Sequence, residues 1–390
     1  VAKGDIDVIP NSSEKFMSFK IKKLRFIDSI QFMAESLEKL ADNLHCKDEE
    51  DEYTKFHAIR SEYPEHYKLL CQKGFYPYEW FDDIEKFNYN GLPPIDDFYS
   101  SLKQDKLKPE DYKHALKVYE SLECKSFKDY HMTYLKTDIL LLADVFENFR
   151  KTCISNYGLD PANYLTSPSL AWDAMLLKTG VKLEQISDYK LFQMIEEQKR
   201  GGLCFVGSRR YAKANNPYLN EHDKTQPTSY LQYWDMNNLY GLAMTQYLPN
   251  GGHKFLETWD IDNILNTPED SKIGYVLRVD LSYPEDKHEL FKQYPPAPEN
   301  TIVREDWLTD YQREIAEKNG IKTHTSQTKL VAHLYPHDKY VIDYRNLNYI
   351  TDLGVKIEKI YDVVQYNQSP WLKPYIDFNI EMRKKYKERF

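Results

Sequence analysis

The chain has 390 residues, a hydrophobic content of 41% and an aromatic content of 14%, which exclude a disordered polypeptide and leave room for two or three domains with real cores. Its formal net charge of -9 disfavours a nucleic-acid partner in general, although the local placement of charge matters more than the total. The 5 cysteines are scattered without a Cys-x-x-Cys pair, so neither a zinc cluster nor a disulfide framework is indicated. An intracellular compartment fits best, and no apolar run approaches the roughly 18 residues of a membrane span, so no membrane partner is expected.

The first 110 residues predict short elements separated by turns. A strand is predicted over residues 19–27 and a helix over 32–44, whereas the acidic run at 48–52 is typical of a surface loop. Residues 55–110 are rich in proline, tyrosine and charge, which favours irregular structure with short helices.

Three helices are predicted next, over residues 109–122, 127–156 and 170–180. In the second of them, Tyr134 and Asp138 lie one turn apart and can point into one cleft, although such a pair is also common on a helix surface. An adjacent face of this helix is predicted to pack in the core. It is formed by Leu135, Ile139, Leu142, Phe146 and Phe149.

A basic segment follows these helices. From Gln198 to Lys213 there is no acidic residue, and Phe205 and Tyr211 are interleaved with cations. Cations neutralise phosphates and aromatic faces stack on bases, so the segment suits a groove that tracks a DNA strand; a solvated basic hairpin is the alternative. Gly201 and Gly202 let the backbone approach a phosphate, because they carry no Cβ. The cations are Lys199, Arg200, Arg209, Arg210 and Lys213.

One aspartate stands where an aromatic stretch meets a helix-forming one. Residues 230–234 favour a buried strand, a Met-Asn-Asn turn follows Asp235, and residues 239–244 are helix formers. Mg²⁺ is usually held by one or two carboxylates and substrate phosphates, so Asp235 at the end of a strand suits phosphoryl transfer. The alternative is that Asp235 only caps the next helix.

The C-terminal part alternates strands and helices. A half-buried strand is predicted over residues 276–283, a helix over 344–353 and a strand over 355–366. A last helix is predicted after Pro370. The acid pair in Asp260-Ile-Asp262 precedes Asn-Ile-Leu and is therefore interpreted as a helix start, not as a metal-binding hairpin.

Several of these segments resemble motifs of family B DNA polymerases, in the order in which that family has them. Asp235-Met-Asn-Asn-Leu-Tyr240 resembles motif A, Asp-x-x-Ser-Leu-Tyr-Pro, and departs from it at Asn238 and Gly241. Lys199-Arg-Gly-Gly202 resembles the Tyr-x-Gly-Gly loop of the protein-primed branch, with a lysine for the tyrosine. Tyr134-Leu-Lys-Thr-Asp138 resembles the third exonuclease motif, Tyr-x-x-x-Asp.

The likeness covers nearly the whole chain and implies a mixed α/β fold. Residues 200–216 and 368–376 are similar to polymerases of Polinton-type transposons and their viral and plasmid relatives. The implied fold is a partial RNase H-like 3′-5′ exonuclease domain followed by a partial α+β polymerase palm with an insertion. The implied segments are 1–185 (C-terminal part of the exonuclease domain), 186–227 (basic Arg-Gly-Gly connection), 228–254 (palm with motif A), 255–345 (insertion like the terminal-protein region) and 346–390 (palm continuation and start of the fingers helix).

The resemblance also implies roles for the residues of motif A. Asp235 would bridge two Mg²⁺ ions with help from the Met236 carbonyl, and backbone amides near Asn238 and Leu239 would receive the triphosphate of a deoxynucleotide. Tyr240 would lie under the sugar and exclude a 2′-hydroxyl, while packing in a core is its alternative role. Lys199, Arg200, Gly201, Gly202, Arg209 and Arg210 would contact DNA.

For the exonuclease, the resemblance implies that Asp138 helps to hold a metal pair and that Tyr134 orients the attacking water. Lys73 would stabilise charge at the scissile phosphate, unless it is only a solvated surface residue. Ser29 or Ser36 would grip the single-stranded primer end. The acid pair Asp5-Ile-Asp7 is interpreted as part of a loop and rejected as a further exonuclease motif.

The activity implied is DNA-directed DNA synthesis, with primer-template and single-stranded DNA, deoxynucleotides and a terminal priming protein as partners. The second polymerase aspartate is expected beyond position 390, so the chain is expected to be an inactive fragment. Two alternatives remain open: a nuclease without polymerase function, and a non-catalytic DNA-binding remnant of a mobile element.

Overall fold

The chain folds into two compact units, residues 1–178 with 378–390 (unit 1) and residues 179–377 (unit 2). The computed structural model describes residues 6–12, 14–46, 49–102, 104–204, 211–323 and 326–387. Within these ranges no helix combines the length and the apolar character that crossing a membrane requires.

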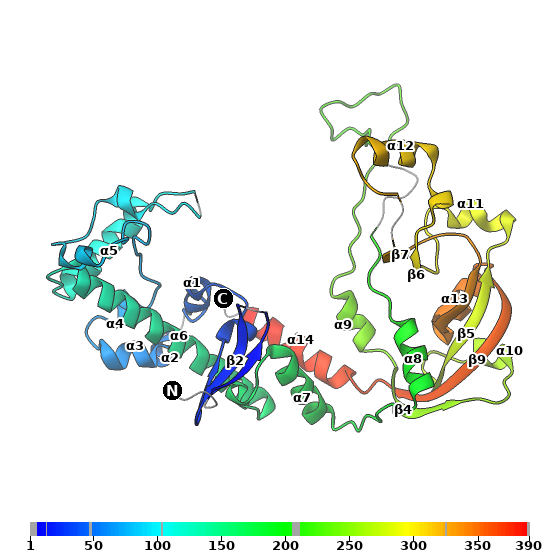
Figure 1. The fold of residues 1–390 in the computed structure, drawn as a ribbon, viewed down its shortest axis with the longest axis horizontal. Coiled ribbons are helices and arrows are strands. Elements are labelled where there is room, and N and C mark those ends of the chain that lie inside the picture. Colours follow the sequence, from blue (N-terminus) through cyan, green and yellow to red (C-terminus); the bar gives the residue numbers. More distant parts are fainter. Residues whose placement is uncertain are drawn as a thin grey trace. The chain divides into compact units, whose positions relative to one another are not determined.

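Unit 1 begins with a three-stranded antiparallel sheet, in the order β1 (Ile6–Pro10), β2 (Phe16–Ile21) and β3 (Leu24–Ile27) (Figure 1). The prediction of one strand over 19–27 is wrong, because the chain turns between β2 and β3 with Lys22 at a φ of 54°. Glycine or asparagine usually occupies a left-handed position in such a turn, and a lysine there is uncommon. The sequence therefore gives no local signal for this turn.

The rest of unit 1 is helical. The helix predicted over 32–44 is shorter, because the Oγ of Ser36 accepts a hydrogen bond from the Lys39 amide and starts the helix at Leu37. The acidic run predicted as a loop is helical from Glu49 onward, because glutamate is a good helix former. This helix packs on the longest helix of the unit. The α-helices are α1 (Leu37–Asp42), α2 (Glu49–Lys55), α3 (His57–Glu62), α4 (Tyr67–Leu70), α5 (Pro109–Ser121), α6 (Phe127–Tyr157) and α7 (Ser167–Thr179).

Helix α6 organises the core of unit 1. Ser126 and Asp129 form a capping box at its start, and Gly158 ends it in the left-handed conformation, as local signals dictate. The predicted core face is wrong, because Leu135 and Ile139 remain 46% and 60% exposed. The helix is apolar on several sides, so spacing does not identify the face that other segments cover. The buried face consists of Phe127, Tyr130, Thr137, Leu141, Asp144, Val145 and Cys153.

Unit 2 is built on a four-stranded antiparallel sheet (Figure 1). Apolar and polar residues alternate in β5 (Ile273–Ser282), which is half-buried as predicted. The strand order is β4 (Leu248–Phe255), β9 (Lys356–Ser369), β5 (Ile273–Ser282) and β8 (His337–Asp343).

Helices cover both faces of this sheet. On one face, Leu277 and Val279 pack with Leu347 of α13 (Tyr344–Asp352) and with α10 (Ile261–Leu265). On the other face, side chains of β5 and β9 pack against α8 (Tyr189–Gln198). Burial of Leu277 and Val279 fixes the register of β5, since a slip by one residue would turn both side chains away from this cluster.

The remaining elements of unit 2 are short. Helix α10 begins after Asp260, whose carboxylate caps it, so the interpretation of this acid pair as a helix start is confirmed.

The described elements confirm the predicted mixed α/β class. The other elements are α9 (Leu239–Met244), α11 (His288–Phe291), β6 (Glu299–Ile302), α12 (Asp310–Lys318), β7 (Thr328–Val331) and α14 (Lys373–Lys387), which continues into unit 1.

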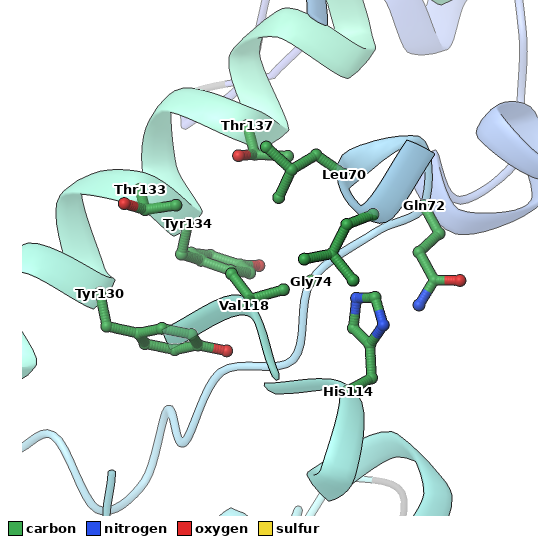
Figure 2. Close-up of a pocket in the computed structure, with 10 residues that line it drawn as sticks. Leu70, Gln72, Gly74, His114, Val118, Tyr130, Thr133, Tyr134 and Thr137 are labelled. Carbon is green, nitrogen blue, oxygen red and sulfur yellow. The ribbon is translucent and has the colours of Figure 1, made fainter. Parts of the chain in front are cut away.

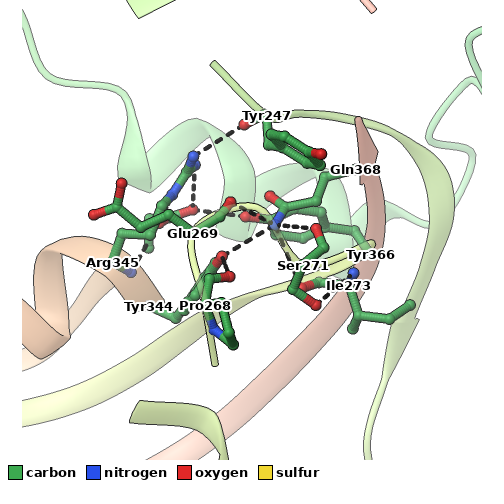
Figure 3. Close-up of polar contacts among 10 residues, drawn as sticks. Tyr247, Pro268, Glu269, Ser271, Ile273, Tyr344, Arg345, Tyr366 and Gln368 are labelled. Carbon is green, nitrogen blue, oxygen red and sulfur yellow. Dashed lines mark hydrogen bonds and ion pairs between the residues drawn. The ribbon is translucent and has the colours of Figure 1, made fainter. Parts of the chain in front are cut away.

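A buried polar network joins the strands of unit 2 to α13 (Figure 3). The carboxylate of Asp343 accepts hydrogen bonds from the Arg345 guanidinium at 2.9 and 3.2 Å and from the Tyr366 hydroxyl at 2.7 Å. Gln368 donates to the Ser271 carbonyl at 2.9 Å and to the Tyr344 hydroxyl at 3.0 Å. The network therefore pairs polar side chains that burial would otherwise penalise.

Replacing Asp343 with alanine is expected to lower the free energy of unfolding by about 3–5 kcal/mol, because Arg345 and Tyr366 lose a buried acceptor. Urea denaturation followed by circular dichroism measures this loss. As a control, Asp377→Ala removes the exposed partner of Lys373 and is expected to cost at most about 0.5 kcal/mol. Equal losses in the two variants would contradict the proposed role of Asp343.

Candidate active site

In unit 1, three predicted exonuclease residues come together although they are distant in sequence. Tyr134 and Asp138 lie on successive turns of α6 and share a side-chain hydrogen bond. The ammonium of Lys73, from the turn after α4, lies close enough to Asp138 to favour its ionised form. The structure thus gathers a carboxylate, a phenol and a cation on one side of α6.

The phenol of Tyr134 is held in place by the turn that carries Lys73. A Cβ on Gly74 would lie 3.0 Å from Cδ2 of Tyr134, a tight contact that would require the Tyr134 ring to shift by a few tenths of an ångström. The ring centroid of Tyr76 lies 4.9 Å from that of Tyr134, and the hydroxyls of Tyr78 and Tyr134 are 2.5 Å apart. Sequence reasoning missed Gly74 and Tyr78; the aromatic run directly after Lys73 is the signal for them.

Burial and two neighbouring side chains have opposite effects on the pKa of Asp138. Burial raises its pKa above the ordinary value, while the hydrogen bond from Tyr134 and the charge of Lys73 oppose this shift. Its Oδ1 atom is buried and has no hydrogen-bond partner among the described residues. Burial and the bonds to Tyr78 and Asp138 also raise the pKa of Tyr134, which stays protonated as a donor.

A small cavity lies beside Tyr134, between α4, α5 and α6 (Figure 2). Its volume is about 20 Å³, and Gly74, His114 and Thr137 are among the residues that line it. This volume holds roughly one water molecule and no nucleotide.

The remaining predicted residues of the exonuclease lie in the N-terminal part of unit 1. Ser36 caps α1, and Ser29 begins a short 3₁₀ helix that is capped by the Asp28 carboxylate. The interpretation of residues around Asp7 as a loop is wrong, because Asp7 lies in β1 opposite Lys20 of β2. Asp5 lies outside the described residues.

In unit 2, the aromatic stretch before Asp235 is not the predicted strand. Residues 230–236 are irregular, with Tyr233 and Trp234 93% and 84% exposed, and Asp235 itself is exposed. A strand needs a neighbour to satisfy its backbone groups, and among the described residues the sheet of this unit is formed by other segments. Strand propensity alone cannot supply that partner.

The helix that follows Asp235 starts as predicted, at Leu239. Its N-cap residue is Asn238, which has a φ of 54°, so the alternative in which Asp235 caps this helix is wrong. A Cβ on Gly241 would lie 2.2 Å from Nδ2 of Asn238, so the two departures from motif A are in contact. Tyr240 is 76% exposed, which contradicts its alternative role in a core.

The basic segment is only partly described. Lys199 forms an ion pair with Glu196. Gly201 and Gly202 are exposed, and a Cβ at either position would have no neighbour within 4 Å. The guanidinium of Arg200 donates to the Val341 carbonyl at 2.8 Å and stacks 3.9 Å from the ring centroid of Tyr340. Arg209 and Arg210 lie outside the described residues.

Among the residues that the structure describes, neither Asp138 nor Asp235 belongs to a group of three or more metal-binding side chains. Within the described ranges, the group of three or more histidine, cysteine or acidic side chains that could share an ion is Glu299, His333 and His337. A two-metal site needs several carboxylates, so one aspartate in each unit does not hold a pair of Mg²⁺ ions. Each aspartate fits the role of a single oxygen ligand.

Comparison with protein families identifies relatives over nearly the whole chain. The model for DNA polymerase type B, organellar and viral, matches residues 4–389. Probable DNA polymerases of Neurospora intermedia and Agaricus bitorquis are 22% and 26% identical to 64% and 50% of this chain. The chain spans only 21% and 22% of the length of these relatives.

Among solved structures, Phi29 DNA polymerase complexed with primer-template DNA is similar, with a TM-score of 0.42 and 13% identity over 97% of this chain and 50% of that one. Because the family model covers almost every residue, the resemblance inferred from the motifs is confirmed. The chain belongs to the type B DNA polymerases of the organellar and viral family.

Proposed function

We propose that the protein is an intracellular DNA-directed DNA polymerase that adds deoxynucleotides to a primer 3′-hydroxyl and carries an associated 3′-5′ exonuclease. The observation that carries this proposal is the grouping of Lys73, Tyr134 and Asp138 in unit 1. These are the residues that the exonuclease motifs pair with one another, and they meet although α5 separates them in sequence. We assign residues 1–185 to the exonuclease part and 228–254 to motif A of the palm.

In the exonuclease part, each of the three side chains has a distinct task. Oδ1 of Asp138 is one oxygen ligand for Mg²⁺, which would supply charge stabilisation at the phosphate when bound. Tyr134, fixed by Tyr78 and Gly74, orients a water with its hydroxyl. The ammonium of Lys73 neutralises negative charge that develops on the scissile phosphate.

In the polymerase part, motif A contributes a carboxylate and a surface for the incoming nucleotide. Asp235 and the Met236 carbonyl supply oxygen ligands for Mg²⁺, and backbone amides at Asn238 and Leu239 receive the triphosphate. The exposed ring of Tyr240 lies two residues after the N-cap of α9, where it can pack under a sugar. Primer-template DNA passes along the segment from Lys199 to Gly202, and a terminal protein is the proposed primer.

Primer extension by protein purified from its complete reading frame tests this proposal. Extension of a primed template with Mg²⁺ and deoxynucleotides supports it. A protein that binds primed DNA but neither extends nor degrades it would instead support the non-catalytic remnant. Degradation without extension would support a nuclease.

Replacing Tyr240 with alanine is expected to raise ribonucleotide incorporation relative to deoxynucleotide incorporation by at least about tenfold, because the ring no longer excludes the 2′-hydroxyl. The measurement is the ratio of kcat/KM for the two sugars. Tyr233→Ala, another exposed tyrosine of the same segment, is the control and should leave the ratio unchanged. An unchanged ratio in Tyr240→Ala removes the sugar-excluding role.

A further inference from the structure

A compact group of metal-binding side chains lies in unit 2, away from the motif A segment in sequence. Glu299 is the first residue of β6, His333 follows β7, and His337 is the first residue of β8. One donor atom from each residue can be chosen so that all three lie within 4.8 Å of one another. Two imidazoles and one carboxylate are the ligand set that Zn²⁺ and similar transition metals prefer.

His337 is held in the form that binds a metal. The residue is 0% exposed, and its Nε2 donates a hydrogen bond to the Ala297 carbonyl at 2.8 Å. Because a carbonyl only accepts, the proton must lie on Nε2, which leaves a lone pair on Nδ1. That Nδ1 is buried and has no partner in hydrogen-bond geometry among the described residues, although a backbone group of Tyr335 lies near the ring. A ligand histidine in metalloproteins typically donates its other nitrogen to a carbonyl in this way.

His333 and Glu299 complete the group. Nε2 of His333 lies 3.0 Å from Oε2 of Glu299, and the His333 ring stacks on the His337 ring with centroids 4.5 Å apart. The His333 side chain is only 7% exposed, whereas that of Glu299 is 30% exposed. Solvent therefore reaches the group from the side of Glu299, where water can complete the coordination of an ion.

Two aromatic rings shield the group from solvent. The rings of Trp307 and Tyr340 pack against the two histidines and exclude solvent.

We propose that Glu299, His333 and His337 bind one transition-metal ion of the Zn²⁺ class, which fastens β6 to the start of β8. Bonds of about 2.0–2.2 Å require the three donors to contract from their present spacing. His333 changes tautomer on binding: its proton leaves Nε2, which becomes a ligand, and a proton is taken up on Nδ1, so its net charge is unchanged. The hydrogen bond that Nδ1 accepts from the Tyr335 amide at 3.2 Å is then lost.

Metal binding to the untagged 390-residue chain tests this proposal without reference to any polymerase activity. After treatment with a chelator, the chain is titrated with Zn²⁺ by calorimetry and with Co²⁺ by visible absorption. One ion per chain is expected, with a Co²⁺ spectrum typical of nitrogen and oxygen ligands. Zn²⁺ should also raise the midpoint of thermal unfolding.

Two variants remove single ligands while keeping the size of the side chain. His337→Gln retains an amide that can donate to the Ala297 carbonyl, and Glu299→Gln lies at the more exposed edge, where misfolding is not expected. Each substitution should weaken Zn²⁺ binding by more than about 10–100-fold. A loss of that size already follows when only a residue that hydrogen-bonds to a ligand is replaced. The control is His253→Gln, since Nδ1 of His253 is also buried without a hydrogen-bond partner in the described structure.

The control should bind Zn²⁺ like the unmodified chain. Absence of binding at one ion per chain would overturn the proposal. So would weak binding that survives both ligand substitutions, because it would mark an adventitious ion only. In either case Glu299, His333 and His337 would be a hydrogen-bonded part of the core.

Discussion

Replacing Asp235 with alanine in protein from the complete reading frame is expected to reduce nucleotide incorporation by at least about 10³-fold, because a lost metal ligand costs several kcal/mol of transition-state stabilisation. DNA binding should change little. The Asp235 side chain has no hydrogen bond or ion pair to other described residues, so its loss removes no structural contact. Single-turnover primer extension measures the first effect, and fluorescence anisotropy with a primed template measures the second.

The control for this experiment is Asp262→Asn. Asp262 belongs to the acid pair at the start of α10 and faces solvent there, in the same unit as Asp235. Synthesis by this variant should equal that of the unmodified protein. If Asp235→Ala retains synthesis within about tenfold, Asp235 does not hold a metal ion in the reaction.

Replacing Asp138 with asparagine is expected to reduce 3′-5′ degradation of single-stranded DNA by at least about 10³-fold. An amide is a far weaker metal ligand than a carboxylate, yet it fits the same space on α6 and can still accept the hydrogen bond from Tyr134. The rate of degradation of a labelled oligonucleotide measures the loss. Glu147→Gln, an exposed acid of the same helix, is the control.

The same Asp138 variant is expected to be more stable than the unmodified chain at neutral pH. Because the folded protein raises the pKa of Asp138, folding favours the protonated form, and ionisation weakens the fold as the pH rises past the ordinary value of 3.8. Asparagine carries no such penalty. Urea denaturation at pH 4 and pH 7 should therefore show an advantage for Asp138→Asn that grows with pH, and a constant or reversed difference would contradict burial as the cause.

Elements with local signals could be predicted from the sequence. Helix α6 has a capping box at Ser126 and a terminating Gly158, and α13 begins at the capping Asp343. Each signal depends on residues within one turn, so no knowledge of distant segments is needed. The grouping of Tyr134 with Asp138 follows from helical spacing for the same reason.

Features that depend on distant segments could not be predicted in this way. The residues around Tyr233 have strand propensity, but a strand forms only where a second segment pairs with it. Helical spacing does not identify the core face of α6. Segments from elsewhere in the chain cover Leu141 and leave Ile139 exposed. Glu299 approaches the two histidines where β6 pairs with β7, a contact between segments that no local spacing predicts.

The contact between Asn238 and Gly241 links the two positions at which this chain departs from the Ser and Pro of the motif that it resembles. With Asn238 in its present rotamer, any side chain at position 241 overlaps the amide, since even a Cβ would lie 2.2 Å from Nδ2. Because these atoms belong to a flexible side chain, a residue other than glycine at 241 requires Asn238 to change its rotamer. Exchanging the two positions singly and together for serine and proline tests whether their effects on stability are coupled.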